Sequence, residues 1–455
     1  MSLPLISKAA ARYTGAGGKE HCSLCRHFSP RRGGRCARVL GDISPRGWCR
    51  LFSREMRGLV ADASSFNGGG GPSLGLDFMM PGVLDPRITF TRASTATYFN
   101  SAGVMQTAAV NQPRWDYDAA TRTLRGLLIE EARTNVLPNG NAPTVLSGGA
   151  TIAASADIQP LFAGAVVNKH TITGGPARGY VSVTGLTAAT AYAFSLWLYV
   201  PTSVTRTDLA PYNNTGEGLT GTQTNASAAY YNMTRKGTWQ RLTMIYTTGA
   251  AETALNAFFM RGLDIGDVFY TTAYQIEAGA FATSYVPTTS AAVTRAQDRC
   301  SISAANMAPW FNALTGSWFA EFVFQNPTSP NIRILASLGQ PAGGSAGMVF
   351  VDPAQHVAQY DGGTALVTTS PALVVNAVSK GASTWAAGTG QVCGNGGAVL
   401  SGAMPGGFGT LSTLGVCFLI PSNPGVTDNA TGYLRRVSYW SRALTGAEMQ
   451  TVTTL

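Results

Sequence analysis

The stretch that decides the fold runs from residue 192 to residue 200 and reads Tyr192-Ala193-Phe194-Ser195-Leu196-Trp197-Leu198-Tyr199-Val200. Its aromatic and aliphatic side chains are typical of a buried β-strand. Residues 239–246 alternate between apolar and polar side chains, as a half-buried strand does. Because such strands and turn signals alternate from about residue 136 to residue 298, this region is predicted to be a β-sandwich.

A second set of strands begins near residue 299. Its members are predicted at residues 318–324, 333–338, 348–351 and 433–440. Helical patterns are few: residues 127–133 look helical, and residues 444–452 form a second candidate in which Thr445 caps the N-terminus and Glu448 follows three residues later. The chain is therefore expected to be mainly β.

The composition fits several domains with little charged surface. The chain has 455 residues, of which 45% are hydrophobic and only 12% are charged. A chain of this length predicts two to four domains. No apolar stretch is long enough to cross a membrane, and no signal peptide precedes the chain, so synthesis and assembly in a reducing cytoplasm are expected.

Changes in composition divide the chain into five segments. The predicted organisation is a basic four-cysteine domain, a Gly/Ser-rich linker, a connecting segment and two β-sandwich domains, at residues 1–58, 59–75, 76–135, 136–298 and 299–455; the resemblances given below imply a jelly-roll domain for the fourth segment and a lectin-like domain for the fifth.

The positive charge belongs to the first segment. Residues 1–58 contain 12 of the 32 Lys and Arg but 3 of the 23 Asp and Glu, a balance of +9, and the remainder is neutral. A basic segment can contact nucleic acid. No stripe of aromatic and basic residues accompanies the charge, which argues against a nucleic-acid partner.

Four cysteines in that segment have the spacing C-x2-C-x10-C-x12-C, formed by Cys22, Cys25, Cys36 and Cys49. A segment this short cannot bury much core, so a metal centre would serve as the core. Tetrahedral zinc and a [4Fe–4S] cluster both accept four thiolates. The two isolated cysteines favour the larger cluster, with zinc as the alternative.

The residues around these cysteines sharpen that choice. The segments Cys22-Ser23-Leu24-Cys25-Arg26-His27-Phe28 and Gly47-Trp48-Cys49, with Tyr13 upstream, resemble the high-potential iron–sulfur protein family. The resemblance implies that the four cysteines bind a cluster. A structural role for the cluster is favoured over a redox role, because no electron partner is evident. It also implies that Tyr13, Phe28 and Trp48 form the apolar shell around the cluster.

Two further stretches resemble tail-fibre and minor virion proteins of tailed bacteriophages. The first comprises residues 90–98, 108–114 and 126–135, and the second comprises residues 274–279, 282–288 and 293–298. In that class such segments bracket a jelly-roll module similar to carbohydrate-binding domains. Residues 432–448 resemble the last strand and closing helix of concanavalin-like and laminin-G-like lectins.

These resemblances imply a phage structural protein, located in the virion and assembled in the host bacterial cytoplasm. Its partners would be other virion proteins and a host surface polysaccharide, and a homo-oligomer such as a trimer is expected. The leading hypothesis is a tail-fibre or tail-tip adhesin that docks through the N-terminal domain. The alternative is a capsid or head fibre or a decoration protein with purely structural contacts.

Sandwich lectins bind sugars by stacking aromatic rings against them. Candidate residues for such contacts are Tyr212, Tyr230, Tyr231, Trp310, Tyr360 and Trp385. Carboxylate pairs occur at Asp116/Asp118 and Glu130/Glu131, and we expect the second pair to form ion pairs with Arg133 or a neighbouring chain. Since no nucleophile or phosphate-binding motif is present, the chain is expected not to be an enzyme.

Overall fold

The chain folds into two compact units, Met1–Gly75 and Leu76–Leu455. The structure is a computed structural model. It describes residues 28–29, 35–36, 71–82, 84–141, 145–175, 178–205, 220–224, 231–261, 264–325, 333–339, 345–352, 354–360, 365–367, 372–404, 413–417 and 431–454. In the first unit, β1 (Phe28–Ser29) pairs with β2 (Arg35–Cys36), and Phe28 lies opposite Cys36.

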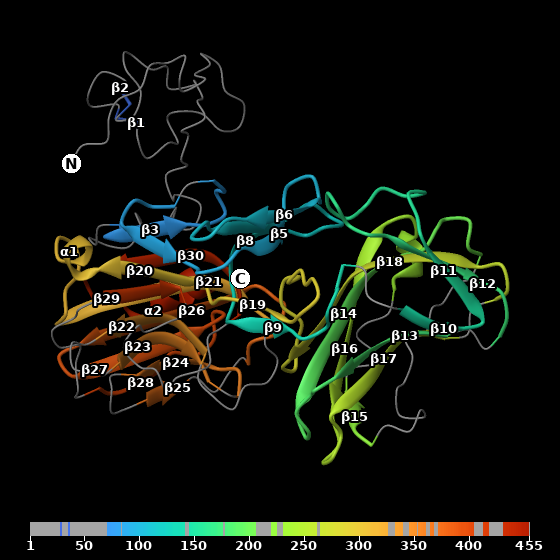
Figure 1. Ribbon diagram of the computed structural model, residues 1–455. Coiled ribbons are helices and arrows are strands. Elements are labelled where there is room, and N and C mark those ends of the chain that lie inside the picture. The colour runs from blue at the N-terminus through green and yellow to red at the C-terminus, as the bar shows by residue number, and fades with distance from the viewer. Residues whose placement is uncertain are drawn as a thin grey trace. The chain divides into compact units, whose positions relative to one another are not determined.

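The first sandwich of the second unit pairs a six-stranded antiparallel sheet with a three-stranded one (Figure 1). The larger sheet has the order β11 (Ala150–Ala154), β12 (Asn168–Ile172), β18 (Val268–Ala278), β14 (Ala191–Tyr199), β16 (Trp239–Thr247) and β15 (Thr222–Thr224). The smaller sheet has the order β10 (Val145–Gly148), β13 (Arg178–Thr184) and β17 (Ala254–Arg261). A short 3-10 helix, η5 (Met233–Arg235), precedes β16.

The two sheets share one apolar core. Leu196 and Met244 from the larger sheet pack with Val181 and Ala257 from the smaller sheet, and each is at most 2% exposed. Because side chains alternate along a strand, the residues between these core positions project from the opposite face of the larger sheet. That opposite face, described below, carries Trp197 and Arg241.

The second sandwich pairs a seven-stranded sheet with an eight-stranded one. The first has the order β25 (Ala365–Val367), β24 (Val357–Tyr360), β23 (Ser345–Val351), β22 (Arg333–Gly339), β29 (Thr413–Cys417), β20 (Arg299–Ser303) and β4 (Ile88–Thr91). The second has the order β28 (Leu400–Ala403), β27 (Thr389–Gly394), β26 (Ser379–Ala386), β21 (Thr315–Phe324), β30 (Gly432–Trp440), β8 (Leu124–Ile129) and β7 (Arg114–Tyr117). Contacts of β24 with β27 and of β23 with β26 show that the two sheets face each other.

Segments far apart in the sequence build this second sandwich. The expected connecting segment contributes β4 to one sheet and β7 and β8 to the other. It also forms β3 (Leu74–Asp77), the hairpin of β5 (Ala96–Phe99) and β6 (Met105–Ala108), and β9 (Arg133–Asn135), which pairs with β19 (Val293–Arg295). The connecting segment is thus hydrogen-bonded into the sheets that follow it.

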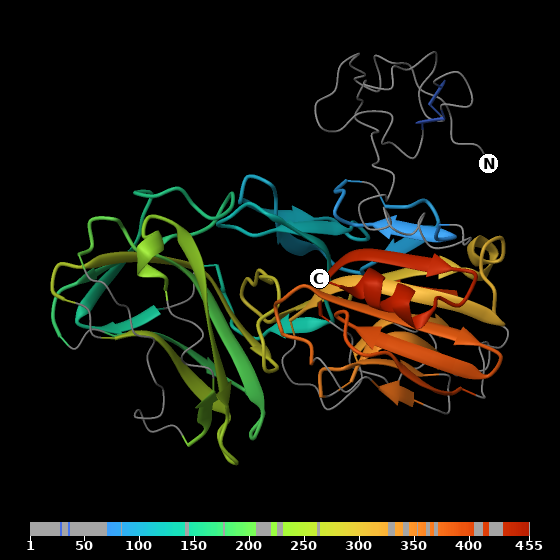
Figure 2. The same ribbon diagram turned by 180° about the vertical axis from the view of Figure 1, so that it is seen from behind.

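Helices are short in the described part of the chain. They are α1 (Ala304–Met307) and α2 (Gly446–Thr453), and α2 packs against β26 and β27 (Figure 2). Thr445 caps α2 in a capping box with Glu448, which confirms the predicted C-terminal helix. No helix among the described residues is long and apolar enough to cross a membrane.

The prediction of a mainly β chain is confirmed, whereas the helix expected at residues 127–133 is wrong. Leu127 and Leu128 lie in β8, between β7 and β30, and both are buried. Pairing with strands on both sides satisfies this backbone, and such tertiary contacts override the local preference for helix. The jelly-roll and lectin assignments stay predictions.

Candidate functional site

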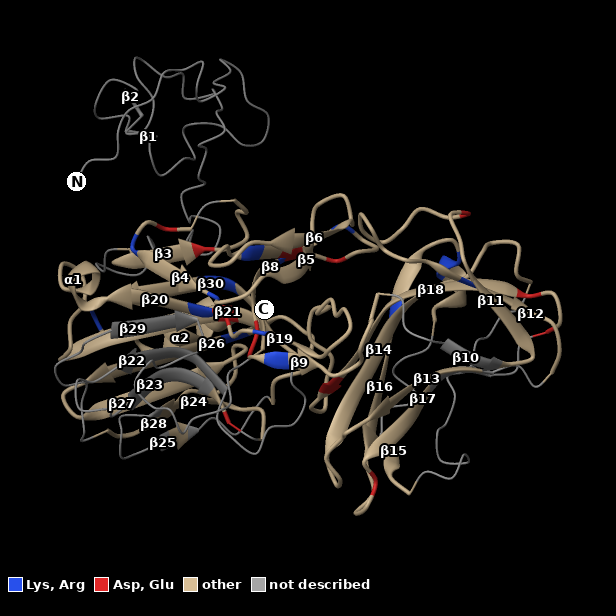
Figure 3. Ribbon diagram, in the orientation of Figure 1, with Lys and Arg blue, Asp and Glu red and all other residues tan. Residues whose placement is uncertain are grey.

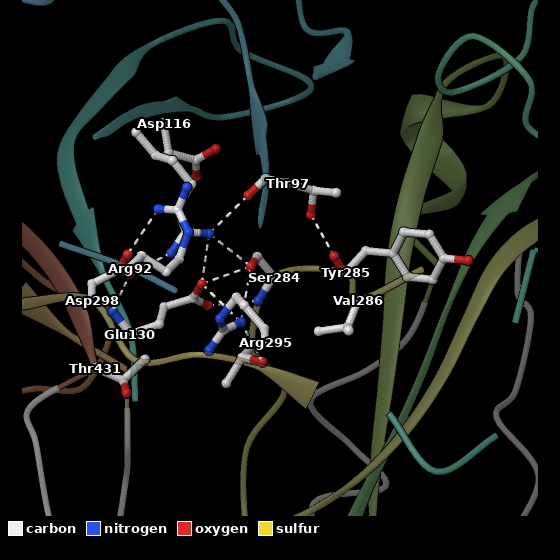
Figure 4. Close-up of polar contacts among 12 residues, drawn as sticks. Arg92, Thr97, Asp116, Glu130, Ser284, Tyr285, Val286, Arg295, Asp298 and Thr431 are labelled. Carbon is white, nitrogen blue, oxygen red and sulfur yellow. Dashed lines mark hydrogen bonds and ion pairs between the residues drawn. The ribbon is translucent and has the colours of Figure 1, made fainter. Parts of the chain in front are cut away.

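A buried charge cluster holds the second unit together where its segments meet (Figure 4). Arg92 Nη1 lies 3.0 Å from Asp298 Oδ1, and Arg114 Nη2 contacts the other oxygen of Asp298. Glu130 Oε2 lies 2.8 Å from Arg114 Nη1 and 3.0 Å from Arg295 Nη1. The five side chains are at most 1% exposed, so each charge depends on the others for compensation.

Hydrogen bonds complete the cluster. Asp298 Oδ2 accepts the Glu130 N–H at 2.9 Å, and Glu130 accepts the N–H and the hydroxyl of Ser284, each at 2.6 Å. Burial alone would raise the pKa of Glu130, but Arg295, Arg114 and the Ser284 bonds outweigh it and lower the pKa to about 2. Glu130 is therefore ionised at neutral pH.

The cluster unites the two stretches that resemble phage proteins. Arg92, Arg114 and Glu130 come from the first stretch, and Arg295 and Asp298 come from the second, about 200 residues later. The expected ion pair with Arg133 forms only for Glu131. Glu130 binds two arginines that adjacent sequence could not reveal, because their positions depend on tertiary structure.

Beside the cluster lies a cavity of about 690 Å³. Its aromatic lining consists of Tyr98, Phe99, Tyr117, Trp197, Trp239, Phe281, Tyr285 and Tyr433. Its polar lining includes Asp116, Asp118, Arg125, Arg235, Gln240 and Arg241. The size lies within the usual range for small-ligand sites, about 300–1,000 Å³. The lining combines aromatic rings with many polar groups.

The pairing of β14 with β16 shows which lining residues lie on the same face of the six-stranded sheet. On β14 and β16, Trp197 lies opposite Arg241, and Tyr199 lies opposite Trp239. Directly paired residues project from the same face of a sheet, so Trp197, Trp239 and Arg241 share the face that turns away from the sandwich core. Phe99, from β5, packs on Trp197 with ring centroids 5.0 Å apart.

A series of hydrogen bonds among Arg125, Tyr433 and Asp116 also lies in the lining of the cavity. Arg125 donates to the Tyr433 hydroxyl at 2.9 Å, and that hydroxyl donates to Asp116 Oδ2 at 2.9 Å. Asp116 also accepts the Phe99 N–H at 2.6 Å. Burial raises the pKa of Asp116, and these hydrogen bonds offset the rise only in part.

Charged side chains are otherwise sparse along the strands of the six-stranded sheet, as Figure 3 shows. The charges of the cluster and the cavity are therefore a local feature of a chain with little charge. Each lies where strands of different sheets meet the connecting segment.

Three of the aromatic residues singled out as glycan contacts, Tyr231, Trp310 and Trp385, lie outside this cavity. Tyr231 is 3% exposed in the core of the first sandwich, and its hydroxyl bonds to Val200 N–H and Thr238 carbonyl groups. Trp385 is 4% exposed and donates to the Ala313 carbonyl, while Trp310 is half-buried and packs on Tyr439.

None of these three residues lines the cavity. Tyr212, Tyr230 and the side chain of Tyr360 lie outside the described residues. The residues that do line the cavity come from segments that local sequence patterns do not connect. A glycan role for the six predicted aromatics stays a prediction.

The cofactor prediction has to be corrected. Within the described residues, no group of three or more His, Cys, Asp or Glu side chains could hold a metal ion. Cys300 and Cys393, described with their side chains, are buried free thiols. Suitable spacing is not sufficient for a metal site, because the thiolates must also converge at about 2.3 Å from the ion.

We therefore no longer assign a [4Fe–4S] cluster or a zinc ion to this chain. Cys22, Cys25 and Cys49 lie outside the described residues, as do Tyr13 and Trp48. For Phe28 and Cys36 the structure describes only their pairing in β1 and β2.

Comparisons with known proteins identify no family. No family model and no curated protein matches the chain. The phage, iron–sulfur and lectin resemblances thus gain no support from these comparisons.

Solved structures with weak similarity include sugar-related proteins. The CBM40 module of a Ruminococcus gnavus IT-sialidase, bound to α2,3-sialyllactose, is 14% identical over 31% of this chain and 84% of that chain, with a TM-score of 0.26. A Trypanosoma rangeli sialidase in complex with the inhibitor DANA is 10% identical over 67% of this chain and 62% of that chain, with a TM-score of 0.27. The tandem CBM22 domains of Paenibacillus barcinonensis Xyn10C are 10% identical over 68% of this chain and 97% of that chain, with a TM-score of 0.23. TM-scores this low assign neither a family nor a ligand to the chain.

Proposed function

We propose that the chain is a glycan-binding protein and that the cavity between β16 and the connecting segment is its binding site. The observation that carries the proposal is the pairing of exposed ring surface with fixed polar groups. Trp239 is half-buried and lies next to Gln240 and Arg241 in sequence, and the hydrogen-bonded residues Asp116, Tyr433 and Arg125 line the same cavity. Sugar rings have apolar faces that pack on aromatic rings and hydroxyl groups that need hydrogen-bonding partners.

The surrounding structure supports this proposal. The buried charge cluster fixes the connecting segment, and β14 and β16 are paired along nine residues each. A ligand entering such a rigid site loses little free energy to ordering of the protein. We propose binding only, without hydrolysis of the glycan.

The finer proposal is that this binding attaches a bacteriophage particle to its host. Its support is the resemblance of residues 90–135 and 274–298 to tail-fibre proteins and the Gly68–Gly71 run of a linker that would tether an exposed adhesin. The alternative is a capsid decoration protein with structural contacts alone. Its support is that five charged residues of those stretches are used internally, in the buried cluster.

A glycan array probed with the full chain tests the proposed site. We expect Trp239→Ala to weaken binding by about tenfold or more, because stacking and burial of one ring contribute about 1.5–3 kcal/mol. The control is Phe311→Ala, which removes a half-buried aromatic ring outside the cavity and should leave binding unchanged. Equal binding by wild type and Trp239→Ala would contradict the assignment of the site.

A further inference from the structure

The cavity contains an arginine that the protein does not neutralise. Arg241 Nη2 donates to the Ser195 hydroxyl at 2.9 Å. Its Nε–H is buried and has no acceptor, and no carboxylate of the described residues lies within ion-pair distance of its guanidinium. A guanidinium has five N–H donors, so a single neutral hydroxyl satisfies little of it.

Other arginines near the cavity differ in this respect. Arg125 forms an ion pair with Asp118, and Arg114 forms ion pairs with Asp298 and Glu130. Arg235 also lacks a carboxylate among the described residues, but its side chain is exposed and water can solvate it. In this set only Arg241 combines a buried, unpartnered Nε–H with the lack of a carboxylate within ion-pair distance among the described residues.

The electrostatics agree with the geometry. Burial lowers the pKa of Arg241, and the more distant carboxylates of Glu277 and Glu130 offset this only in part. A buried cation without a partner is unfavourable, and an anion that enters the site relieves that penalty. The residual charge therefore favours a negatively charged ligand.

The neighbours of Arg241 define the rest of such a ligand. Trp197 lies directly across the sheet, about 5 Å away between Cβ atoms, and Trp239 lies two residues along the same face, about 7 Å away. The face therefore places one cation next to two aromatic rings. The planar fork of a guanidinium can donate two parallel hydrogen bonds to a carboxylate.

We propose that the glycan is acidic, with a sugar-ring carboxylate that binds Arg241 while the ring packs beside Trp239. The inference rests on the proposed function and specifies the class of glycan. It makes Arg241 a specificity-determining residue, since neutral sugars would leave its charge without a partner.

The test uses an array of carboxylated, sulfated and neutral bacterial glycans, probed with the full chain. Binding is expected only to carboxylated glycans, and chemical reduction of the carboxyl groups to alcohols should abolish it. Arg241→Met should lower affinity for the bound glycan by more than tenfold, and Arg241→Lys should restore part of it because the charge remains. Arg299→Met, at an exposed arginine outside the cavity, is the matched control and should change affinity less than threefold.

Each other outcome is decisive. Binding of neutral or sulfated glycans that Arg241→Met leaves intact would overturn the acidic-sugar inference. If Trp239→Ala still abolished that binding, the proposed function would stand. Absence of binding to every glycan class would overturn the proposed function together with the inference. Equal thermal unfolding midpoints for wild type and Arg241→Met would show that a loss of binding is not a loss of fold.

Discussion

The three arginines of the buried cluster and Arg241 of the cavity differ in how the protein compensates their charge. Arg92, Arg114 and Arg295 share Asp298 and Glu130, and every one of them has a carboxylate within ion-pair distance. Arg241 has only a serine hydroxyl. The neutralised group fixes segments that are far apart in sequence, whereas the unneutralised arginine is open to a ligand. The presence or absence of a carboxylate partner thus distinguishes the arginines that stabilise the fold from the arginine of the proposed binding site.

Removal of a carboxylate from the cluster should have the largest effect. Asp298→Asn leaves Arg92 and Arg114 without their shared counter-ion, which should lower the free energy of unfolding by about 3–5 kcal/mol. The midpoint of urea unfolding measures this change. Asp85→Asn is the control, because Asp85 pairs with a partly exposed Arg87 and should matter by about 1 kcal/mol at most. Equal losses would remove the distinction drawn between buried and surface pairs.

Acid should weaken the same cluster. The pKa of Glu130 is about 2 in the folded chain and near 4.5 when unfolded. Because the folded value is the lower one, its stabilisation is complete above about pH 4.5 and is lost as the pH falls toward 2. Urea midpoints measured from pH 5 to pH 2 should decline less steeply for Glu130→Gln than for wild type. Parallel curves would show that folding does not lower the pKa of Glu130.

Tyr433 lies where the architecture meets the cavity. Its hydroxyl links Arg125 to the buried Asp116, so Tyr433→Phe should destabilise the chain by about 1 kcal/mol and weaken glycan binding a few-fold. Urea unfolding and titration with the array ligand measure the two effects. A variant with unchanged stability and unchanged affinity would exclude this hydroxyl from both regions.

The smallest effect on stability is expected from loss of the N-terminal cap of α2, which is a local and uncharged contact. Thr445→Ala removes the capping bond of α2 and should lower the free energy of unfolding by about 1 kcal/mol, without any change in glycan binding. A change in affinity would show that α2 influences the cavity, contrary to the site assigned here.

Local sequence predicted the elements whose pattern is self-contained. The strands at residues 192–200 and 239–246 match β14 and β16, and Thr445 with Glu448 marks the start of α2. The stretch at residues 127–133 misled, because Leu-Leu-Ile-Glu-Glu favours helix in isolation. Its partner strand β30 lies about 300 residues later in the sequence, and a local hydrophobic pattern cannot predict pairing over that separation.

The site was harder to predict for the same reason. Phe99, Trp197, Trp239 and Tyr433 meet only after the sheets have formed. One signal was present: in a chain with 12% charged residues, arginines and carboxylates recur in short apolar stretches, such as Glu130 after Leu127-Leu128-Ile129. Such placement predicts buried ion pairs, although not which residues pair.

The most direct measurement compares Arg114→Met with Arg241→Met, using urea unfolding and glycan affinity on the full chain. Arg114→Met should lower stability sharply, because it leaves Glu130 and Asp298 with too few partners. Arg241→Met should keep or raise stability, since it removes an uncompensated charge, and should lose the glycan. Equal loss of stability in both variants, with the glycan still bound by Arg241→Met, would contradict the distinction between architecture and site.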